Sequence, residues 1–119
     1  MSSPYQIYLI SDSTGETLDR IFLALKAQFK NFSYETNHFS FTRTENQVLK
    51  ILETLNSKDK TIILYTIVDN NLSKFLSNEA KKKNIPCFGV LGDLIISFSK
   101  LLDQEASFKP SGQHALTDE

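Results

Sequence analysis

The sequence is poor in cysteine and lacks tryptophan altogether. Cys87 is the only cysteine among 119 residues, so no disulfide can form within the chain, which suits a reducing compartment. Neither sign of charge dominates, because the formal net charge is −1 at pH 7. This balance gives no global field that would favour nucleic acid or an anionic membrane as a partner.

Long hydrophobic runs are also missing. The longest apolar stretches, at 62–68 and 94–98, are far too short to span a bilayer. The first residues, Met1 to Pro4, have neither the basic segment nor the apolar segment of a signal peptide. We therefore expect a cytoplasmic protein.

The chain alternates between strand patterns and helix patterns. Apolar or β-branched runs predict strands over 5–10, 32–41, 61–68 and 85–91, and each is followed by apolar residues at helical spacing. This alternation predicts an α/β fold of the Rossmann or flavodoxin type, with helices on both faces of a four-stranded parallel sheet in the order 2-1-3-4. We expect one domain over 1–103, followed by an irregular tail over 104–119, which has no apolar periodicity.

Several polar residues match helix-start signals. Ser13 with Glu16, and Thr44 with Gln47, fit the capping box, and Asp69 is suited to cap the third helix. Asn84 is expected to end that third helix.

The segment between the first predicted strand and helix is crowded with polar groups, and two interpretations of it stay open. Its residues are Ser11, Asp12, Ser13, Thr14, Gly15, Glu16 and Thr17. They either start the helix only, with Ser13 as its cap, or form a ligand loop in which an anion lies against the N–H groups of residues 15–17. Asp12 and Glu16 would repel a bare phosphate, so a metal-bridged nucleotide or a hydroxyl partner suits the loop better. It is not a P-loop, because no Gly-x-x-x-x-Gly-Lys-Ser/Thr pattern occurs in the chain.

Other candidates for this site come from the loops at the same edge of the predicted sheet. Thr66, Asp69 and Asn70 follow the third strand, which should lie beside the first at the switch point. Arg43 is within reach of this crevice and is suited to hold a phosphate in a bidentate contact; an ordinary surface arginine is the alternative.

The sequence predicts neither a nucleophilic cysteine nor a metal site formed by cysteine and histidine. Cys87 falls inside an expected strand, which favours a buried structural thiol over a nucleophile. His38 and His114 share no short spacing with it, so we predict no metal site.

Four blocks of the sequence resemble those of a known family. Residues Leu9–Thr17 resemble the N-terminal signature of the bacterial pyruvate, phosphate dikinase regulatory protein family, which includes the phosphoenolpyruvate synthase regulatory proteins. Residues Tyr65–Asp69, 85–92 and Pro110–Leu116 resemble later blocks in the same order, although Gly112 is offset by one place.

The resemblance implies a bifunctional enzyme. Family members use ADP to phosphorylate a threonine of the dikinase or synthase, which inactivates it, and use inorganic phosphate to remove that group with release of pyrophosphate. They are thus protein serine/threonine kinases and phosphorylases, with ADP and phosphate as substrates. No cofactor is implied for this chain itself.

The resemblance also implies that the family's phosphate loop lies in a C-terminal domain beyond Glu119. The 104–119 tail then leads toward that absent domain, and the chain alone should have little phosphotransferase activity. The choice between dikinase and synthase, and between monomer and homodimer, stays open. The alternative is a stand-alone receiver-like or flavodoxin-like binding module with Asp69 as the phosphoacceptor, although no lysine lies at the end of the fourth strand.

Overall fold

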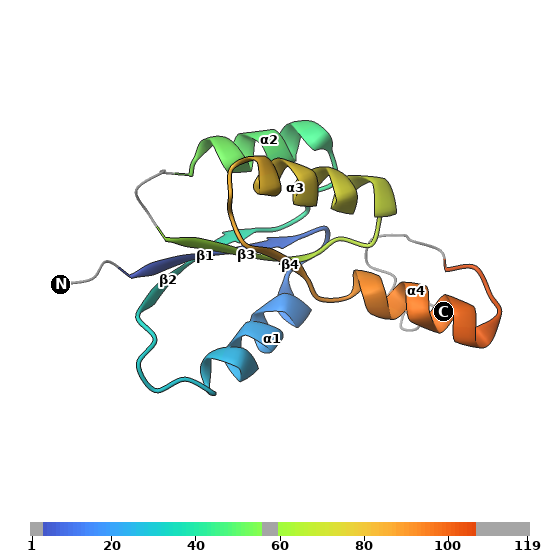
Figure 1. The fold of residues 1–119 in the computed structure, drawn as a ribbon, viewed down its shortest axis with the longest axis horizontal. Helices are drawn as coiled ribbons and strands as arrows, with labels where there is room; N and C mark the ends of the chain where they lie inside the picture. Colours follow the sequence, from blue (N-terminus) through green and yellow to red (C-terminus); the bar gives the residue numbers. More distant parts are fainter. Residues whose placement is uncertain (1–3, 56–59, 107–119) are drawn as a thin grey trace.

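The computed structural model describes residues 4–55 and 60–106 (Figure 1). Strands and helices alternate along this part of the chain. In order they are β1 (Tyr5–Ser11), α1 (Glu16–Lys26), β2 (Tyr34–Phe39), α2 (Glu45–Glu53), β3 (Thr61–Thr66), α3 (Asn70–Lys82), β4 (Cys87–Gly89) and α4 (Gly92–Leu102). The predicted block Pro110–Leu116 and His114 lie outside the described residues.

The four strands form one parallel sheet in the order β2-β1-β3-β4, which confirms the predicted fold class and strand order. The last residues of the two central strands, Ser11 and Thr66, lie opposite each other in register. The switch point therefore opens between β1 and β3, at the carboxyl ends of the strands, where α/β sheets bind their ligands.

Two apolar cores lie on the two faces of the sheet. Helices α2 and α3 cover one face and α1 covers the other (Figure 1). Ile7 and Leu9 of β1 pack with Leu18 and Phe22 of α1. The alternate β1 residues, among them Ile10, pack toward α2 and α3. Each such fully buried side chain contributes about 1.5–3 kcal/mol relative to exposure, so β1 is held from both sides.

Three of the four predicted helix-end signals are confirmed. Thr44 and Gln47 form a complete capping box, and Asp69 caps α3. Asn84 ends α3 with a left-handed backbone (φ 58°). The predicted Ser13–Glu16 box is wrong, because Gly15 is the N-cap of α1 and Glu16 is its first residue. The left-handed turn at Gly15 (φ 92°) delays the helix start by two residues.

The last helix differs from the other three. None of its eleven residues is buried, and it extends away from the sheet beside the end of β4 (Figure 1). The sequence predicted this helix, but not that its apolar residues would leave the sheet. Among the described residues, no helix has the length and apolar character needed to cross a membrane.

Candidate functional site

Three loops meet at the carboxyl edge of the sheet. They are residues 12–15 between β1 and α1, residues 40–44 between β2 and α2, and residues 67–69 between β3 and α3. Strand register aligns the ends of β1 and β3, while hydrogen bonds join the loops themselves. The candidates predicted from these loops are therefore brought together.

Asp12 ties the first loop to the third. Its carboxylate oxygen Oδ2 accepts the Val68 N–H at 2.8 Å, and its own N–H donates to the Thr66 carbonyl at 3.1 Å. The side chain is only 3% exposed, and this burial raises its pKa, although the Val68 hydrogen bond opposes the shift. Asp12 therefore turns inward and holds two loops together.

Backbone hydrogen bonds fasten the second loop onto the first. The Phe41 N–H donates to the Ser13 carbonyl and the Thr42 N–H to the Ser11 carbonyl, each at 2.9 Å. The Ser40 hydroxyl adds a hydrogen bond to the Thr14 carbonyl at 3.0 Å. The sequence reasoning did not identify Ser40 as part of the site; its only signal was a polar residue near the end of the predicted strand 32–41.

Arg43 lies beside the first loop, as predicted. Its Nε donates to the Asp12 carbonyl at 2.8 Å, and its guanidinium lies 5.5 Å from the centre of the Phe41 ring. No hydrogen bond of its two Nη groups to a described residue is found, so these donors are available to a ligand. Phe41 has a positive φ of 55°, a conformation that costs a bulky residue about 1–3 kcal/mol and recurs at functional sites.

The N-terminus of α1 forms the floor of the site. The first backbone bond of the helix runs from the Asp19 N–H to the Gly15 carbonyl, and the Glu16 N–H lies 3.5 Å from Thr14 Oγ1. Within the described residues, the N–H groups of Gly15 and Thr17 have no acceptor. Unpaired donors together with the positive end of the helix dipole favour an anion here.

Asp69, which follows β3, has a structural role. One carboxylate oxygen of Asp69 accepts the N–H groups of Asn71 and Leu72, at 2.9 and 3.1 Å. Thr66 is buried under the loops, whereas Asn70, the first residue of α3, is exposed. Asp69 therefore acts as the helix cap, which leaves it poorly suited to the receiver-like role of phosphoacceptor.

Thiol and imidazole groups lie apart from these loops. Burial raises the pKa of Cys87 to about 12, which keeps it a thiol at neutral pH, as expected for a structural cysteine. His38 Nε2 lies 2.9 Å from an Asp19 carboxylate oxygen on the exposed surface. Within residues 4–55 and 60–106 no three His, Cys, Asp or Glu side chains are grouped to hold a metal ion.

Known proteins resemble this chain over nearly its whole length. A protein of Pelagibacter ubique (strain HTCC1062) is 66% identical over 119 residues, which are 100% of this chain and 43% of that protein. Proteins of Chelativorans sp. (strain BNC1) and Alkaliphilus oremlandii (strain OhILAs) are 33% and 36% identical over 97% and 87% of this chain, and over 42% and 37% of their own lengths. All three are named as pyruvate, phosphate dikinase regulatory proteins.

The chain thus spans less than half the length of the curated relatives it matches. The sequence model of a family described as kinase/pyrophosphorylase matches residues 7–119, which include β1 from Ile7 onward and all three loops of the site. The chain belongs to the kinase/pyrophosphorylase family.

Proposed function

We propose that this chain is the N-terminal part of a bifunctional enzyme that controls pyruvate, phosphate dikinase. In the inactivating direction the β-phosphoryl group of ADP moves to a threonine oxygen of the dikinase, the threonine proton is released, and AMP leaves. In the activating direction an oxygen of inorganic phosphate attacks the phosphothreonine phosphorus. The threonine oxygen then leaves and regains its proton, and pyrophosphate is the product.

Family membership supports the kinase and pyrophosphorylase chemistry, and the names of the relatives favour the dikinase over the synthase as the target. ADP and inorganic phosphate are the proposed substrates. The alternative of a stand-alone receiver-like module has less support, since Asp69 serves as a helix cap.

One observation carries the proposed role of this chain: Arg43 and the N-terminus of α1 face the same loop. Arg43 is anchored through Nε to the Asp12 carbonyl, which leaves its Nη groups for a ligand. The Gly15 and Thr17 N–H groups supply further donors. We propose that these groups hold a phosphoryl or other anionic group of the ADP or of the dikinase, since backbone donors and arginine suit phosphate oxygens.

Asp12 has a supporting role in this proposal. Its carboxylate faces Val68 rather than the α1 N-terminus, so it repels an anion less than its position in the sequence suggested. Glu16 is exposed at the first helix position and carries negative charge close to the anion. Thr14 and Thr17, both exposed, offer hydroxyl donors that offset part of this repulsion.

The test is a hybrid enzyme in which this chain replaces the 119 matching residues of the Pelagibacter relative. Dikinase is incubated with the hybrid and ADP, and threonine phosphorylation is followed by mass spectrometry together with loss of dikinase activity. Inorganic phosphate is then added and pyrophosphate release is measured. We expect both reactions from the hybrid and neither from the 119-residue chain alone, because the chain has no phosphate loop.

The matched variants are Arg43→Gln and Arg20→Gln, each in the hybrid. Arg20 is exposed on α1 and makes no described side-chain contact, so its loss should leave both rates unchanged. Loss of a charged donor to phosphate should lower kcat/KM for Arg43→Gln by about 10–100-fold, equivalent to about 1.4–2.7 kcal/mol. Equal rates for the two variants would contradict the role of Arg43, whereas a folded hybrid without either reaction would contradict the proposed function.

A further inference from the structure

Phe41 is a large apolar side chain that is exposed within an otherwise polar site. Its ring is 52% exposed and belongs to neither of the two apolar cores of the described residues. Its backbone has a positive φ of 55°, which is unfavourable for a bulky residue. The ring thus adds little to the packing of the fold, although its backbone is strained.

Hydrogen bonds on both sides of Phe41 hold this strained conformation. Its N–H donates to the Ser13 carbonyl at 2.9 Å, and its carbonyl accepts a hydrogen bond from Gln47 Nε2 at 3.2 Å. Gln47 is itself fixed, because its side-chain oxygen accepts the N–H groups of Arg43 and Thr44, at 2.7 and 3.0 Å. The first loop and the first turn of α2 therefore determine where the ring lies.

The ring lies beside Arg43, which holds a phosphoryl group in the proposed function. The centre of the ring is 5.5 Å from the guanidinium carbon. Arg43 is exposed, and its Nε is already bonded to the Asp12 carbonyl. A phosphoryl group bound by the Nη groups would therefore have an apolar surface directly next to it.

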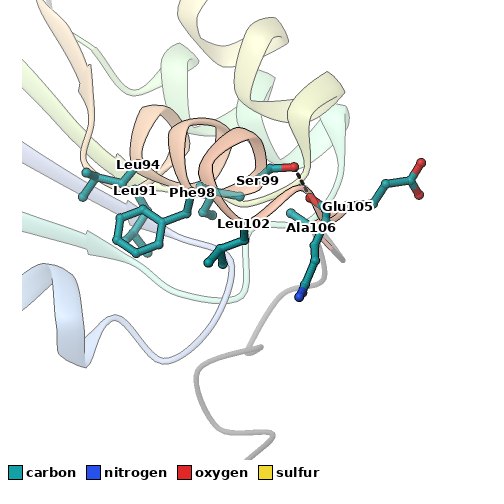
Figure 2. Close-up of a pocket in the computed structure, with 9 residues that line it drawn as sticks. Leu91, Leu94, Phe98, Ser99, Leu102, Glu105 and Ala106 are labelled. Atoms are coloured by element: carbon teal, nitrogen blue, oxygen red, sulfur yellow. Dashed lines mark hydrogen bonds between the residues drawn. The ribbon is translucent and has the colours of Figure 1, made fainter.

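This arrangement differs from that of the exposed apolar side chains of α4. Leu94, Phe98 and Leu102 lie together along a cavity of about 430 Å³ that is lined mainly by apolar groups (Figure 2). Phe41 instead presents its ring beside a cation. Such a pair suits a small group that carries an anion and an apolar part on neighbouring atoms.

The two phosphate-bearing substrates of the proposed reaction differ in this respect. In phosphothreonine, the carbon that carries the phosphate oxygen also carries a methyl group, whereas the phosphates of ADP adjoin each other and a polar ribose. We infer that Phe41 receives the methyl group of the dikinase's target threonine while Arg43 holds its phosphoryl group, an inference that rests on the proposed function. Phe41 then favours threonine over serine, and this part of the site serves the protein substrate rather than ADP.

Binding of small phosphorylated compounds to the 119-residue chain tests the inference without catalysis. N-acetyl-phosphothreonine N-methylamide, its phosphoserine equivalent and ADP are each titrated, and the Gly15 and Arg43 resonances are followed by NMR. We expect the phosphothreonine compound to bind about fourfold more tightly than the phosphoserine compound, which is the effect of burying one methyl group. Equal affinities, or binding of neither compound, would overturn the inference.

Phe41→Asn and Phe41→Tyr are the matched variants. Asparagine tolerates a left-handed backbone, so Phe41→Asn should remove the ring without loss of stability in urea unfolding, whereas Phe41→Tyr retains the ring. We expect the preference for phosphothreonine to disappear in Phe41→Asn and to persist in Phe41→Tyr, with equal ADP affinity in all three chains. A preference that survives in Phe41→Asn would refute the role of the ring. A loss that affects ADP instead would refute it too, because the ring would then contact the nucleotide.

The hybrid enzyme separates this inference from the proposed function. Its ADP-dependent reaction is measured on dikinase and on dikinase whose target threonine is replaced by serine. We expect the ratio of kcat/KM for threonine to that for serine to fall about fourfold in the Phe41→Asn hybrid and to stay unchanged in the Phe41→Tyr hybrid. An active hybrid with the same ratio in Phe41→Asn would overturn the inference alone. A hybrid that phosphorylates neither protein would contradict the proposed function, and the binding measurement would then decide the inference.

Discussion

Replacing Gly15 with alanine tests whether the site depends on a left-handed backbone at the start of α1. Gly15 has φ 92° and ψ 2°, and a Cβ there would meet only Ser11 Cβ and Ser40 Oγ, both at an ordinary 3.8 Å. The side chain therefore fits, and the cost comes from the backbone. It is about 1–2 kcal/mol for an L-residue in this region. Alanine also lowers the conformational entropy of the unfolded chain, which stabilises the folded state by about 0.4–1 kcal/mol. The expected net loss in the free energy of unfolding is therefore about 1 kcal/mol.

Urea unfolding followed by circular dichroism measures this loss. The matched control is Gly92→Ala, because a Cβ at Gly92 would meet nothing within 4 Å and the residue has no positive φ. That control should be neutral or slightly stabilised, and Gly15→Asn should lie between the two, since asparagine tolerates the left-handed region better than alanine. If Gly15→Ala were as stable as Gly92→Ala at equal m-values, the argument from backbone strain would be refuted.

Three further predictions concern Asp12, Gly89 and Cys87. Burial raises the folded-state pKa of Asp12 above its ordinary value of 3.8, so the free energy of unfolding should fall as pH rises between these two values. Asp12→Asn retains an oxygen for the Val68 N–H but should remove that fall. If the urea midpoints of the parent chain and of Asp12→Asn changed equally between acidic and neutral pH, this prediction would be contradicted. Gly89→Ala places a Cβ 2.7 Å from the Tyr65 ring and should cost about 1–3 kcal/mol in urea unfolding; no loss would show that the ring moves freely. Cys87, with a pKa of about 12, should react with a thiol reagent at neutral pH far more slowly in the folded chain than in urea, and equal rates would argue against its burial.

Much of the fold could be predicted because it depends on local patterns. The apolar run at 61–68 indicated a strand covered on both faces, and the polar content of 32–41 placed that strand at the sheet edge; both are confirmed. Thr44 and Asp69 were predictable as caps since a cap interacts with residues two or three positions away. The same rule was wrong for Ser13, because the left-handed turn at Gly15 makes that glycine the N-cap of α1.

The inner geometry of the site was less predictable. Asp12 bonds to Val68, 56 residues further along the chain, and Arg43 bonds to Asp12 across 31 residues. The positions of Asp12 and Arg43 after predicted strands identified them as candidates, but the direction of a side chain depends on which loops the sheet brings together. Likewise, the apolar spacing of α4 indicated a helix with one apolar face without indicating what covers that face.

Two backbone hydrogen bonds between the first two loops constrain the lengths of these loops but not the identity of their side chains. Phe41 N–H to Ser13 carbonyl and Thr42 N–H to Ser11 carbonyl involve no side-chain atoms. An inserted or deleted residue in either loop would break this pairing, while most side-chain replacements would leave it intact. The edge of the sheet can thus keep one shape while it carries different sets of polar groups, and a change of ligand preference here would require substitutions rather than remodelling.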